Sequence, residues 1–135
     1  MNELFHLVQF QDAALLLVRL ALAAIFIYHG DQKIHYWRMH HNAEISAGWL
    51  ALWRTLSVVE LLCGAGMLTG AFTKIAGLLL MAVMLGALYF KIRVWKKAFA
   101  GDGGWEFDLI LFAAVFLVFI MGAGGYSIDA RVFGL

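Results

Sequence analysis

Four apolar segments dominate the sequence, at residues 13–30, 49–70, 73–92 and 106–124. Each is about as long as the ~20 apolar residues that a helix needs to cross the hydrocarbon core of a bilayer. The apolar residues are continuous rather than alternating, which is typical of spanning helices and not of barrel strands. The sequence therefore predicts an all-α fold, an integral membrane four-helix bundle. It forms a single transmembrane domain over residues 1–135, with both termini on the same side.

Composition supports a membrane protein rather than a soluble domain. Hydrophobic residues make up 64% of the chain and charged residues only 14%, whereas soluble domains have roughly 45–50% apolar and about 25% charged residues. A soluble chain of 135 residues could not bury so much apolar surface. The one cysteine, Cys63, lies inside an apolar segment, which excludes a thiol–disulfide relay within one chain. No nucleic-acid-binding pattern is present, so we expect no nucleic acid partner.

Basic residues gather beside two of the connections between the apolar segments. Seven lysines and arginines lie in or beside residues 31–48 and 93–105. Only two lie on the other side of the membrane, when Arg19 is counted as buried. The seven are Lys33, Arg38, Arg54, Lys91, Arg93, Lys96 and Lys97, and the two are Lys74 and Arg131. The positive-inside rule therefore predicts cytoplasmic loops and periplasmic or extracellular termini. All five tryptophans also fall on the loop side, which indicates a strongly anchored rim or a partner surface.

Two opposite charges lie within the apolar segments, Arg19 in the first and Glu60 in the second. An ionisable group at mid-bilayer costs at least ~2.5–3.5 kcal/mol on insertion scales, so it is rare unless it is paired or functional. The two residues are at similar depths, and we predict that they pair through charge-assisted hydrogen bonds. Such a pair either fixes the register of the two helices or forms part of a ligand or proton site. The sequence leaves both interpretations open.

A second polar group is expected at the cytoplasmic ends of the first and fourth segments. His29 and Lys33 close the first segment, and Glu106 and Asp108 open the fourth, so the four side chains can approach one another. Carboxylates at a helix start also stabilise the helix without any further function. The functional interpretation is a polar pocket in which His29 exchanges protons. The surrounding rings, among them Trp105, suit a flat ligand such as a quinone.

Neither a metal site nor a haem is predicted. His35, His40 and His41 follow no standard ligand spacing, and no cysteine or carboxylate ladder accompanies them. A haem held by two histidines needs two intramembrane imidazoles, and only His29 lies near an apolar segment in a suitable position.

The order of these residues resembles that of the DoxX family of small bacterial membrane proteins. The motifs that carry the resemblance are Arg19-Leu-Ala-Leu, Tyr28-His29-Gly30 with Gln32-Lys33, Glu60-Leu-Leu, Gly70-Ala-Phe-Thr, Gly104-Trp-Glu-Phe-Asp-Leu and Gly122-Ala-Gly-Gly-Tyr-Ser-Ile-Asp129. The resemblance implies a multi-pass protein of the bacterial inner membrane. It also implies similarity to the membrane subunit of thiosulfate:quinone oxidoreductase, which passes electrons to the quinone pool, and to subunits of oxidative-stress defence complexes. Residues 34–49, rich in His and Trp, match none of these motifs.

We therefore expect a redox-linked membrane subunit that holds a quinone or another lipid-soluble carrier. The residues expected to be catalytic are His29, Glu60, Glu106 and Asp108, and those expected to bind the ligand are Arg19, Lys33 and Trp105. His29, Glu106 and Asp108 would deliver protons, while the Arg19–Glu60 pair would polarise a carbonyl or tune the site. Electrons would come from a soluble or membrane-bound redox partner. The alternative is a non-catalytic anchor that recruits soluble partners through the Trp-rich rim. A small cation transporter is less favoured, because pairing with Arg19 would neutralise Glu60. A homo-oligomer is compatible with four short helices.

Overall fold

The computed structural model describes residues 8–41 and 45–134, and these residues form helices and turns without a strand. The four long helices fall on the four apolar segments, which confirms the all-α prediction. In chain order the elements are α1 (Gln11–Gln32), the 3₁₀ turn η2 (Ile34–Trp37), α2 (Ala47–Thr69), α3 (Thr73–Tyr89), the π-helical turn η3 (Phe90–Val94), α4 (Glu106–Met121) and the π-helical turn η4 (Asp129–Phe133).

Three of these helices are long and apolar enough to cross a membrane, namely the stretches Val8–Trp37, Ala47–Thr69 and Thr73–Val94 in the described part of the chain. The chain is therefore a multi-pass membrane protein. Helix α4 has 16 residues and is about 24 Å long, shorter than the roughly 30 Å hydrocarbon core. The fourth crossing, and with it the side on which each terminus lies, remains a prediction.

The helix ends follow local chemistry. Ser46 caps α2, because its Oγ accepts a hydrogen bond from the Trp49 backbone N–H at 3.3 Å. Helix α2 ends at Gly70, whose φ of 68° is left-handed and is readily adopted by glycine. Helix α4 ends three residues before the predicted boundary, because Gly122 also takes a positive φ, of 83°.

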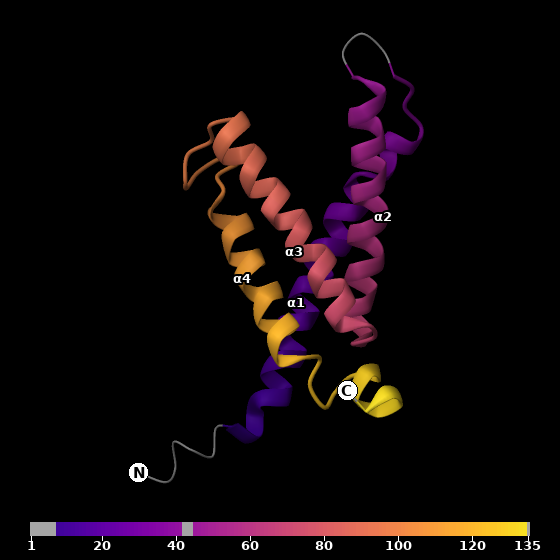
Figure 1. Ribbon diagram of the computed structural model, residues 1–135, viewed down its shortest axis with the longest axis vertical. Helices are drawn as coiled ribbons and strands as arrows, with labels where there is room; N and C mark the ends of the chain where they lie inside the picture. The colour runs from indigo at the N-terminus through magenta and orange to yellow at the C-terminus, as the bar shows by residue number, and fades with distance from the viewer. Residues whose placement is uncertain (1–7, 42–44, 135) are drawn as a thin grey trace.

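The helices pack as two antiparallel pairs. Helix α1 packs along most of α2, and α3 packs along α4, whereas α1 and α4 contact each other at few positions. The pairs converge beside the short turn between α2 and α3 and diverge toward the loops that follow α1 and α3 (Figure 1). The loop end of the molecule is therefore where the two pairs are furthest apart.

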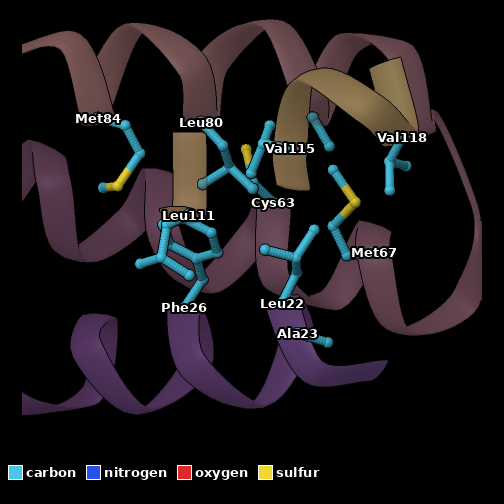
Figure 2. Close-up of a cluster of buried hydrophobic side chains, with 11 residues drawn as sticks. Leu22, Ala23, Phe26, Cys63, Met67, Leu80, Met84, Leu111, Val115 and Val118 are labelled. Carbon is cyan, nitrogen blue, oxygen red and sulfur yellow. The ribbon is translucent and has the colours of Figure 1, made fainter. Parts of the chain in front are cut away.

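All four helices contribute to the apolar core between the pairs (Figure 2). Met67, Leu80, Val115 and Val118 have no accessible surface, and Phe26 is 1% exposed. Lipid tails are as apolar as these side chains, so the core is held by close packing more than by removal of surface from water. Large apolar residues are exposed on the outward faces of all four helices, as expected for a surface that meets lipid.

Candidate functional site

Arg19 does not pair with Glu60, so that prediction is wrong. The guanidinium is 1% exposed and donates to backbone carbonyls in the last turn of α2 and in the turn that follows α4. Its Nε bonds Met67 O at 3.0 Å and its Nη2 bonds Leu68 O at 3.5 Å, while Nη1 bonds the carbonyls of Ala123 and Tyr126. Carbonyls at a helix C-terminus lack partners within the helix and carry partial negative charge, which a cation stabilises.

The register of α1 against α2 explains why the predicted pair does not form. A Cβ added to Gly30 would contact Ser57 O and Leu61, and one added to Gly64 would contact Ile27. With the two helices set in this way, Arg19 lies opposite the last turn of α2. Glu60 is eight residues earlier, about 12 Å along the helix axis.

Glu60 pairs instead with Lys33 at the end of α1. Lys33 Nζ lies 2.5 Å from Glu60 Oε2, and the two side chains are 15% and 4% exposed. The same ammonium donates to His29 O at 3.0 Å. One turn away, Ser57 Oγ donates to Gly30 O at 2.9 Å, which ties the same two helices together.

A second ion pair joins the end of α3 to the start of α4. Lys91 Nζ, in η3, lies 2.5 Å from Asp108 Oδ2 and donates to Gly104 O at 3.2 Å. The two side chains are 22% and 10% exposed. Each ion pair therefore lies within one helix pair, and neither connects the two.

His29 is the group between these two ion pairs. Its imidazole is half-buried and interacts electrostatically with Lys33, Glu60, Lys91 and Asp108. These five residues are called the loop-side cluster below. In the part of the chain that the structure describes, no hydrogen bond is made to either imidazole nitrogen. The ring centroid lies 6.2 Å from that of Phe107 on α4 and 6.2 Å from that of Tyr28, so His29 reaches from one helix pair to the other.

Residues 14–93 match the sequence model of the DoxX family. The match covers more than half of the chain. This protein belongs to the DoxX family. No curated protein and no solved structure gives a match. Arg19, His29, Lys33, Glu60 and Lys91 all lie within the DoxX match, whereas α4 with Asp108 lies beyond it.

The structure brings together four of the residues predicted for the site of this DoxX protein, His29, Lys33, Glu60 and Asp108. Glu106 is exposed on the other side of α4, because two residues along a helix are separated by about 200°. Trp105 is half-buried and packs edge-on against Phe99, with ring centroids 4.6 Å apart. Neither Glu106 nor Trp105 joins the cluster.

Sequence reasoning missed Lys91, which it treated as one of the basic residues that set topology. The available signal was its place at the very end of the third apolar segment, on the same side as the start of the fourth segment. Asp129 was missed as well. Its carboxylate accepts from Phe72 N at 2.7 Å and Thr73 N at 2.8 Å and thereby caps α3, while its own N–H donates to Gly70 O.

Aromatic rings gather at the loop end of the bundle. Trp53 stacks on Tyr36 and on Trp49, and Trp49 meets Phe90 with centroids 5.6 Å apart. This last contact joins α2 to η3 and so crosses between the pairs. In the described ranges, no three His, Cys, Asp or Glu side chains are close enough to hold a metal ion.

Proposed function

We propose that this DoxX protein is a redox-linked membrane subunit that holds a quinone or a similar lipid-soluble carrier against His29. The observation that supports this most directly is the imidazole itself, which has no hydrogen-bond partner among the described residues and is flanked by two partly buried ion pairs. A buried ionisable group inside a membrane helix is a functional candidate by default. The cluster also lies at the end where the two helix pairs diverge.

The residues fit a neutral ring with carbonyl groups. Lys33 and Lys91 are each neutralised by a carboxylate at 2.5 Å, so the two pairs add no net charge. His29 offers a donor on one nitrogen and an acceptor on the other. The rings of Tyr28, edge-on, and Phe107, tilted, lie near the imidazole and add apolar surface to the site.

A bound quinone would accept two electrons and two protons. His29 would donate a hydrogen bond to a carbonyl oxygen and relay both protons, each taken up at one imidazole nitrogen from the aqueous loop side as the other nitrogen gives one up. Glu60 and Asp108 hold Lys33 and Lys91 beside the imidazole. A haem held by two histidines would need two imidazoles inside the long helices, and His29 is the only histidine inside α1, α2, α3 or α4. In this proposal the electrons therefore come from a separate redox protein.

Binding of decyl-benzoquinone to the protein in lipid nanodiscs tests the proposal. Loss of one hydrogen bond is worth about 0.5–1.5 kcal/mol, so His29→Leu, which has neither donor nor acceptor, is expected to weaken binding by roughly two- to tenfold. The matched control is His40→Leu, an exposed loop histidine, which leaves the dissociation constant unchanged. A wild-type protein that neither retains quinone on purification nor binds it refutes the proposal.

Exposed residues on the loop after α3 favour a second candidate, an anchor for soluble partners. Trp95 is 47% exposed, and Arg93, Lys96 and Lys97 are exposed beside it. Co-purification from native membranes separates the two functions. A partner that is lost on Trp95→Ala or on the double change Lys96→Ala and Lys97→Ala, but is kept by Glu60→Gln, supports the anchor.

A further inference from the structure

A groove of about 600 Å³ runs along the outer face of α4 at its loop end. Its walls are mainly apolar and are formed by Phe99, Glu106, Phe107, Leu109, Ile110 and Ala113. Ile110 is 66% exposed and Phe107 is 43% exposed, so the groove opens toward the lipid.

The helical positions show how the groove relates to the loop-side cluster. At about 100° per residue, Glu106, Ile110 and Ala113 lie within roughly 60° of one another and form a strip about 10 Å long. Asp108 is about 200° from Glu106 and points into the bundle, where it is 7% exposed. Phe107 lies between these two faces. It lines the groove and its ring is also 6.2 Å from that of His29.

We propose that this groove holds the apolar tail of the ligand whose ring lies against His29. This inference rests on the proposed function and specifies its ligand class as a neutral polar ring joined to a hydrocarbon chain. The ring passes between α1 and α4, past Phe107, while the tail stays in the groove on the lipid side.

The arrangement of charges and contacts favours this path. Helices α1 and α4 contact each other at few positions, and the ion pairs Lys33–Glu60 and Lys91–Asp108 each lie within one helix pair. The ring can therefore enter without breaking either ion pair. The exposed carboxylate of Glu106 at the rim disfavours an anionic phospholipid headgroup, so an ordinary acidic lipid is the poorer occupant.

Photolabelling tests the placement of the tail. The probe is decyl-benzoquinone with a diazirine at the end of its chain, applied to the protein in nanodiscs and mapped by peptide mass spectrometry. Label is expected on residues 106–113, and excess decyl-benzoquinone without the diazirine is expected to abolish it. An alkyl diazirine without the ring is the control for contact with bulk lipid, and it labels all lipid-facing helices without competition.

Two matched variants sharpen the result. Ala113→Phe fills the groove from an exposed position and is expected to remove the competed label. Ala82→Phe adds the same bulk at an exposed position on α3 and leaves the label in place. Label that appears on another helix and is abolished by excess decyl-benzoquinone refutes the groove as the site of the tail, while leaving the quinone site itself supported. Absence of competed label anywhere, together with absence of quinone binding, overturns both proposals.

Discussion

The ion pair between Lys33 and Glu60 gives the sharpest prediction for stability. Lys33→Met leaves Glu60, which is 4% exposed, without a partner, and loss of one member of a buried pair costs about 3–5 kcal/mol of unfolding free energy. Glu60→Gln is expected to cost less, about 1–2 kcal/mol. The Lys33 ammonium keeps its bond to His29 O at 3.0 Å, and its flexible stem can reach the aqueous loop side.

A double-mutant cycle separates this pair from the alternative with Arg19. Reversible unfolding in mixed micelles, followed by circular dichroism, gives the unfolding free energy of each variant. The cycle of Lys33→Met and Glu60→Gln is expected to show a coupling of about 0.5–3 kcal/mol, as for residues in contact. The cycle of Arg19→Met and Glu60→Gln is expected to be additive within ~0.5 kcal/mol. Additivity in the first cycle or strong coupling in the second refutes the register described above.

Three further changes test the opposite end of the bundle by thermal unfolding in the same micelles, and a fourth, Gly86→Ala, is the control. Gly70→Ala is expected to destabilise the protein strongly, because the added Cβ would lie 2.5 Å from Ser127 Cβ and 2.7 Å from Arg19 Nη2. At Gly86 an added Cβ would have nothing within 4 Å, so Gly86→Ala is expected to be neutral or to stabilise the protein by up to ~1 kcal/mol. Asp129→Ala removes the cap of α3 and is expected to cost about 0.5–2 kcal/mol; an unchanged unfolding temperature contradicts that role. Arg19→Lys is expected to keep only part of the wild-type stability, because an ammonium cannot reproduce the planar fork of donors; full stability would show that the carbonyl contacts contribute little.

The helices could be predicted from sequence because each depends on its own residues. A continuous apolar segment of about 20 residues specifies a spanning helix regardless of what packs against it. The ends could be predicted to within three residues, and the largest differences were at the end of α3 and at Gly122, where a positive φ stops α4 early. Any of several glycines near that point could have ended the helix.

The partners of the buried charges could not be predicted, because they depend on how two helices are set against each other. Arg19 and Glu60 lie at similar depths within their apolar segments, and this favoured an ion pair between them. The close approach of α1 to Leu61 and of α2 to Ile27, which Gly30 and Gly64 permit, moves Arg19 to the end of α2. Small residues let membrane helices approach closely, but which glycine faces which helix is not evident from spacing alone.

The two ends of the bundle are held in different ways, and this bears on where a ligand can bind. At the end away from the loops, Arg19, Asp129 and Asp12 bond backbone groups of other elements, with Asp12 Oδ1 accepting from Gly125 N at 2.8 Å. At the loop end, both ion pairs lie within one helix pair, and the contacts described between the pairs are between rings, such as that of His29 with Phe107. Ring contacts can separate without leaving a buried charge or backbone group unsatisfied, whereas buried hydrogen bonds cannot. Separating the helix pairs at the loop end, beside His29, therefore breaks fewer polar contacts than separating them at the other end.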